Sequence, residues 1–171
     1  SPSRADTDRN FIWTESNGYR GSCLAWRFYW WDDHCLDTGG TPAFASNPNN
    51  LSEGGTGDYS TDDYPYINFA YKWDNVPIDM LVKVTNTPIG DTYGGGHWCI
   101  FNMGGNYADG QFTWGSTVGK VPGFVGDNTW RFASVNVDQA LEQYFGPGNY
   151  NVDHILFWKN ASDVDDHTIY F

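Results

Sequence analysis

Residues 64–73, YPYINFAYKW, decide the fold class of this chain. Ile67, Phe69 and Tyr71 occupy alternate positions, with more polar residues between them. Residues 78–84, IDMLVKV, alternate in the same way. A period of two is typical of β-strands whose two faces meet different environments, so both segments are predicted to be strands.

Further short runs with the same character extend along the chain, separated by clusters of Gly, Pro, Asn and Asp that favour turns. The predicted strands are residues 22–30, 64–73, 78–84, 97–103, 111–115, 130–137, 154–158 and 167–171. Regularly spaced short strands favour a β-sandwich or jelly roll. We therefore predict an all-β domain over residues 11–171, preceded by a polar tail or linker at residues 1–10.

One segment reads as a helix instead. Residues 136–148, NVDQALEQYFGPG, offer Asn136 or Asp138 as an N-cap and Gly146-Pro147 as a stop. The sequence therefore predicts one short helix in a connection between strands.

The composition of the 171-residue chain restricts the class of partner. Aromatic residues make up 18% of the chain, including 9 Trp, and the formal net charge is −12. An acidic protein repels phosphate backbones and anionic lipids, so nucleic acid and membranes are not expected as partners. A neutral polymer is the expected ligand, because aromatic rings stack on its apolar faces.

The sequence also suggests a location outside the cell. We expect the chain to be a segment of a longer secreted protein, covalently linked to a catalytic or cell-surface module. Asn50 and Asn160 begin glycosylation sequons, which agrees with secretion. Cys23 and Cys35 are close in sequence and are predicted to form a disulfide, leaving Cys99 as a small buried thiol.

Residues 27–35, RFYWWDDHC, combine aromatic and metal-capable side chains. A zinc site needs three or four converging ligands, usually in spaced pairs, and no such pairing occurs here. We interpret the segment as a strand that runs into a polar turn and then a half-cystine. Because adjacent strand residues point to opposite faces, Trp31 is expected outside and Trp30 in the core.

Aromatic residues near loops and glycines are candidates for sugar stacking, and neighbouring amides and carboxylates are candidates for hydrogen bonds to hydroxyls. The predicted ligand-binding residues are Trp31, Tyr93, Trp98, Asn102, Asn106, Tyr107, Asp109, Gln111, Trp114 and Trp158. Structural roles are expected for Trp13, Trp73 and Trp130, which lie at strand ends.

Catalysis is not predicted. The three glutamates, Glu15, Glu53 and Glu142, form no recognisable acid–base pair, and no nucleophile-elbow or phosphate-loop motif is present. Aspartate pairs such as Asp32/Asp33 are more typical of solvated turns.

The C-terminal half resembles a known family. Residues 127–137, DNTWRFASVNV, are followed by the helical segment 138–145 and then by residues 151–171, NVDHILFWKNASDVDDHTIYF. This order, over residues 64–171, resembles secreted carbohydrate-binding modules with the galactose-binding-like jelly-roll fold. No cofactor is expected to be required, although modules of this kind often carry one structural calcium. The resemblance leaves open one structural calcium here, whose ligands the sequence does not assign.

We therefore predict a non-catalytic module that binds neutral polysaccharide. Two alternatives remain open at this point. One is a structural or adhesive β-sandwich subunit of an extracellular assembly, because aromatic residues also anchor protein interfaces. The other is a glycan-cleaving enzyme.

Overall fold

The computed structural model describes part of the chain. Its backbone is described over residues 11–18, 21–29, 35–37, 59–73, 78–91, 95–103, 115–159 and 166–171. Side chains are described for residues 18, 59–73, 78–91, 95–103, 115–155, 157 and 170–171.

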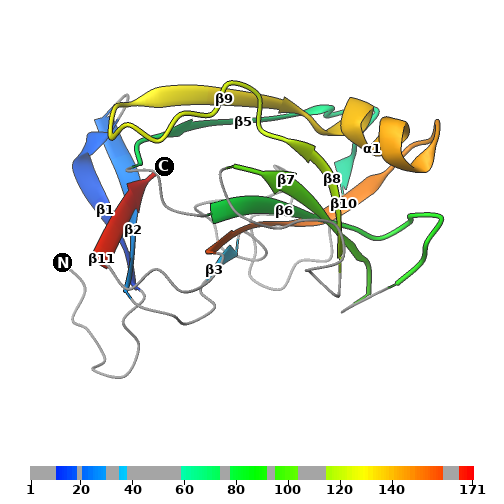
Figure 1. Ribbon diagram of the computed structural model, residues 1–171, viewed down its shortest axis with the longest axis horizontal. Helices are drawn as coiled ribbons and strands as arrows, with labels where there is room; N and C mark the ends of the chain where they lie inside the picture. Colours follow the sequence, from blue (N-terminus) through cyan, green and yellow to red (C-terminus); the bar gives the residue numbers. More distant parts are fainter. Residues whose placement is uncertain are drawn as a thin grey trace.

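The described part of the chain is an all-β sandwich with one short helix, as the sequence predicted (Figure 1). One layer is a six-stranded sheet in the order β3-β10-β6-β7-β8, in which β4 also pairs with β10. Its strands are β3 (Cys35–Asp37), β4 (Tyr59–Ser60), β6 (Ile78–Val84), β7 (His97–Asn102), β8 (Gly115–Lys120) and β10 (Asn151–Lys159). All pairs are antiparallel except β7 with β8, which are parallel.

The second layer is formed by β5 (Tyr66–Tyr71) and β9 (Arg131–Asn136), which pair with each other. A three-stranded sheet of β1 (Phe11–Gly18), β2 (Gly21–Tyr29) and β11 (Asp166–Tyr170) lies at one end of the sandwich (Figure 1). Lys72 and Tyr170 exchange two backbone hydrogen bonds of 3.0 Å, which join this sheet to the end of β5.

The core lies between β5–β9 and the six-stranded sheet. Its inward residues alternate along the strands as period two requires: Ile67 and Tyr71 from β5 face Met80 and Val82 from β6. Trp73 is fully buried, which confirms its predicted structural role. The excess of aromatic residues is thus used partly to fill the core.

The helix α1 (Val137–Phe145) lies between β9 and β10 in sequence. Asn136 is its N-cap, with Oδ1 accepting a hydrogen bond from the Gln139 amide at 3.0 Å. Gly146 ends the helix with φ 103°, a conformation that favours glycine. The predicted helix is therefore confirmed, including its cap.

The central strands are more buried than alternation suggests. Every residue of β6 is buried, and five of the six residues of β7 are buried. Both strands are paired on both sides, and both of their faces are covered. Short continuous apolar runs such as residues 98–101, WCIF, are typical of strands buried on both faces.

Candidate functional site

A cavity of about 510 Å³ lies beside the carboxyl ends of β7 and β8 and the turn that follows β8. Its volume falls within the range of roughly 300–1,000 Å³ that is common for small-molecule sites. Its described lining residues are Asn102, Met103, Lys120, Val121, Gly123, Phe124, Val125 and Gly126. They supply one amide, one ammonium group and one aromatic ring, and none of them is a carboxylate.

Two buried aromatic residues hold Phe124, the aromatic ring of the cavity, in place. Phe124 stacks on Tyr71 with ring centroids 4.7 Å apart, and it lies 4.4 Å from Trp73. The Tyr71 hydroxyl accepts a hydrogen bond from the Val125 amide at 3.2 Å. Because Tyr71 and Trp73 are buried, the position of Phe124 is fixed before any ligand binds.

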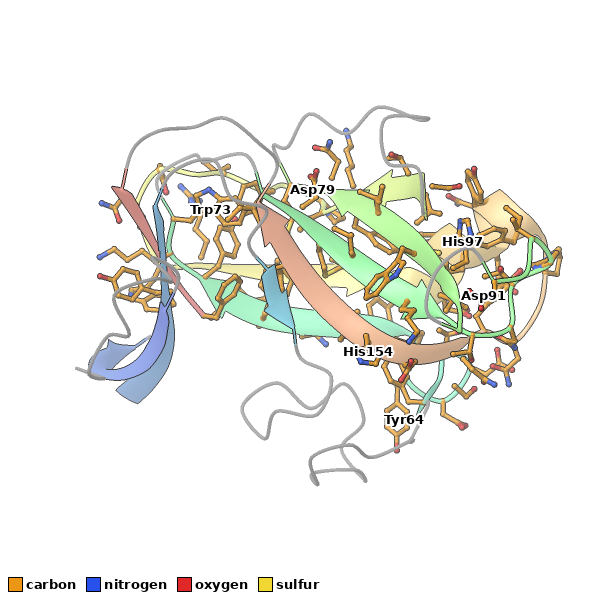
Figure 2. The ribbon with its side chains drawn as sticks, turned by 90° about the horizontal axis from the view of Figure 1, so that it is seen from below. Tyr64, Trp73, Asp79, Asp91, His97 and His154 are labelled. Atoms are coloured by element: carbon orange, nitrogen blue, oxygen red, sulfur yellow. The ribbon has the colours of Figure 1, made fainter. Side chains whose placement is uncertain are left out.

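The polar side of the cavity is built on the end of β7. The Asn102 carbonyl accepts a hydrogen bond from the Val121 amide at 2.9 Å, which ties the strand end to the following turn. The Met103 amide donates to Asp79 Oδ1, also at 2.9 Å, and Asp79 is fully buried. Figure 2 shows Asp79 and His97 toward opposite ends of the six-stranded sheet.

A turn at residues 122–123 contributes Gly123 to the cavity wall. Gly123 has φ 63°, in the left-handed region that glycine adopts without strain. No atom lies within 4 Å of the place where a Cβ would be. The conformation, rather than space, therefore favours glycine here.

A second polar cluster lies on the face of the six-stranded sheet that points away from β5 and β9. Lys83 and Asp153 form an ion pair, and His154 Nδ1 lies 2.9 Å from Asp153 Oδ2 without the alignment of a hydrogen bond. Burial raises the pKa of Asp153, but the hydrogen bond from Lys83 and the charges of His154 and Lys83 outweigh it, so this pKa is lowered overall. The cluster is an internal ion pair within a covered face.

Trp98, predicted as a ligand-binding residue that stacks on sugar, lies beside this cluster and is buried, whereas a stacking ring has to be exposed. Only 8% of its surface is exposed, and its ring lies 6.3 Å from that of His154. Among the described residues, its Nε1 has no hydrogen-bond partner. Trp98 lies on β7, five of whose six residues are buried, and so it fills space within the protein.

Of the predicted ligand residues, the structure places Asn102 in the cavity wall. Trp158 lies on β10, where its backbone pairs with Asp79 and Cys35, but its side chain is outside the description. The others lie outside the described residues: Trp31, Tyr93, Asn106, Tyr107, Asp109, Gln111 and Trp114. The sequons at Asn50 and Asn160, the linker at residues 1–10 and Trp30 lie outside them as well.

The cysteines are described in part. Cys99 is a free, buried thiol, as expected, and burial raises its pKa well above the ordinary value. Cys23 lies on β2 and Cys35 begins β3, strands that belong to different sheets. Their side chains are outside the description, so the predicted disulfide stays a prediction.

Two other features bear on chemistry. Among the described residues, no group of three His, Cys, Asp or Glu side chains converges in a metal-binding arrangement. No helix in the described part of the chain has the length and apolarity that a bilayer-spanning segment needs.

Lys120 and Phe124 were missed as lining residues from sequence. The segment 121–126, VPGFVG, has two glycines around an aromatic residue, the same signal that drew attention to residues 104–114. By the same reasoning, residues 121–126 are a candidate site from the sequence.

No family model, curated protein or solved structure matches the chain.

Proposed function

We propose that this domain is a non-catalytic carbohydrate-binding module that recognises neutral polysaccharide. One observation carries the proposal: the cavity beside β7 and β8 combines a fixed aromatic ring, an amide and glycines, with no carboxylate among its described lining residues. Rings stack on the apolar faces of sugars, and amides both donate to and accept from hydroxyls.

Phe124 supplies the stacking surface in this proposal. Its partners Tyr71 and Trp73 hold the ring, so binding a sugar costs little side-chain entropy. Asn102 and Lys120 supply the polar contacts. Lys120 is exposed and donates hydrogen bonds to hydroxyl oxygens.

The sequence that follows Met103 carries further predicted ligand residues. Met103, a lining residue, is followed directly by residues 104–114, which carry the predicted ligand side chains Asn106, Tyr107 and Trp114. Their role in sugar binding stays a prediction from the sequence, because residues 104–114 lie outside the described residues.

The net charge of −12 supports a neutral rather than an anionic polymer. We further propose that the module acts outside the cell as part of a larger protein, and that sugar binding requires no cofactor. One structural calcium remains part of the proposal as an option carried over from the family resemblance.

Isothermal titration with short neutral oligosaccharides of glucan, xylan and mannan tests the site. Asn102→Ala is expected to weaken binding about tenfold, since one lost hydrogen bond pair of about 1.4 kcal/mol is one decade. Gln143→Ala is the matched control, because Gln143 is an exposed amide on α1. Equal affinity of Asn102→Ala and wild type contradicts the assignment of this cavity.

The same purified domain tests the two alternative functions, a subunit of an assembly and a glycan-cleaving enzyme. Self-association in sedimentation that disappears at low concentration, without glycan binding, indicates an assembly subunit. Release of reducing ends from the polysaccharides indicates an enzyme. Either result overturns the proposal.

A further inference from the structure

The outward face of β5 and β9 carries exposed aromatic rings that do not belong to the core. Tyr66 is 54% exposed and Phe132 is 61% exposed. In an antiparallel pair, residues at alternate positions share one face, so Tyr66 and Asn68 of β5 lie on the same face as Phe132 and Ser134 of β9. We call these four residues the β5–β9 face.

The register spaces the two rings along the strands. Tyr66 pairs with Asn136 and Phe132 pairs with Ala70, so the rings are four residues apart on neighbouring strands. At a rise of about 3.4 Å per residue, this is roughly 14 Å along the strands. Asn68 pairs with Ser134 midway between the rings. The face therefore presents a ring, then an amide and a hydroxyl, then a second ring.

Charge on this face differs from that of the whole chain. None of the outward residues of β5 and β9 is a carboxylate, although the net charge is −12. Lys72, just beyond β5, holds its ammonium 5.4 Å from the Tyr170 ring centroid. An uncharged face offers no ion pair to a charged polymer, and the net charge of −12 repels an anionic one.

The face is small compared with a stable protein interface. Two six-residue strands, about 4.8 Å apart with a rise of about 3.4 Å per residue, cover roughly 200 Å². A stable protein interface buries about 800 Å² per partner. A single extended chain, one sugar wide, fits a strip of this shape.

We infer that the β5–β9 face is a second carbohydrate-binding surface, which takes a linear neutral polysaccharide along the strands. The two rings stack on separate sugars, and Asn68 and Ser134 bind the hydroxyls between them. In Figure 1 the strands β5 and β9 form the upper layer, above β6 and β7. The inference rests on the proposed function for its ligand chemistry but uses residues that the cavity does not contain.

Affinity electrophoresis in soluble β-glucan, xylan and mannan, alongside titration with short oligosaccharides, tests the inference. Tyr66→Ala and Phe132→Ala are each expected to weaken polysaccharide binding about tenfold. They leave short-oligosaccharide binding unchanged, and the melting temperature stays within about 2 °C. Phe132→Tyr retains the ring and is expected to retain affinity. Tyr144→Ala is the matched control, since Tyr144 is 41% exposed on α1.

The outcomes separate this inference from the proposed function. If the double variant Tyr66→Ala/Phe132→Ala binds polysaccharide as wild type does, the inference is overturned while cavity binding stands. If Asn102→Ala alone has no effect, the cavity assignment falls and the inference stands. If the wild type binds neither polymer nor oligosaccharide, both are overturned. Self-association that Phe132→Ala abolishes also overturns the inference.

Discussion

Replacing Trp98 by alanine separates a buried tryptophan from a sugar-stacking one. With 8% of its surface exposed, Trp98 is almost fully removed from water. An aromatic side chain buries roughly 150–250 Å², which at about 25 cal/mol per Å² gives an upper value of roughly 4–6 kcal/mol. Measured Trp→Ala costs in cores are roughly 3–5 kcal/mol. We therefore expect Trp98→Ala to remove about that much unfolding free energy, with no direct effect on glycan contacts.

Urea unfolding followed by circular dichroism measures this loss. Trp98→Phe is expected to cost markedly less, because it keeps a ring and removes an Nε1–H group that has no hydrogen-bond partner in the described part of the chain. Trp130→Ala is the control: Trp130 is half-buried, so its replacement is expected to cost less unfolding free energy than Trp98→Ala. A loss below about 1 kcal/mol for Trp98→Ala, with weaker glycan binding, refutes the buried placement.

Three further predictions concern protonation, helix capping and redox state. Burial lowers the pKa of His97 below its ordinary value of 6.5, so the unfolded chain binds the proton more tightly; stability is fully present above about pH 6.5 and falls at lower pH. His97→Gln should reduce the pH dependence of the urea unfolding midpoint between pH 7.5 and 5.5, and an unchanged pH dependence contradicts this. Asn136→Ala should cost about 0.5–2 kcal/mol by urea unfolding and Asn136→Asp much less, whereas equal losses argue against the cap. Non-reducing peptide mapping should find Cys23 linked to Cys35 and Cys99 free, and any other pairing refutes the disulfide.

The fold class and the helix could be predicted from the sequence because their signals are local. Alternation in residues 64–73 and 78–84 fixed which side chains face inward, and Asn136 and Gly146 marked the helix ends. The strand β8, GSTVGK, was not predicted, because its two glycines and weak alternation resemble a loop. Its pairing with β7 supplies the missing stabilisation.

The site was harder to predict from the sequence, because the exposure of a side chain depends on where its strand lies in the folded protein. Trp98 was predicted to stack on sugar because it lies near loops and glycines, but five of the six residues of β7 are buried. Conversely, alternation in residues 64–73 placed Tyr66 on the polar face, yet its pairing with β9 and the exposed Phe132 required the structure. Asn102 was predicted, whereas Lys120 and Phe124 join it only through the parallel pairing of β7 and β8 and the turn that follows.

Isothermal titration of the wild-type domain with neutral and anionic polysaccharides tests the central claim most directly. We expect saturable binding to at least one of β-glucan, xylan or mannan, and none to polygalacturonate, because the net charge of −12 repels a polyanion. Binding should weaken with Asn102→Ala and persist with Gln143→Ala. Absence of binding to every neutral polymer, or preference for the polyanion, contradicts a module for neutral polysaccharide.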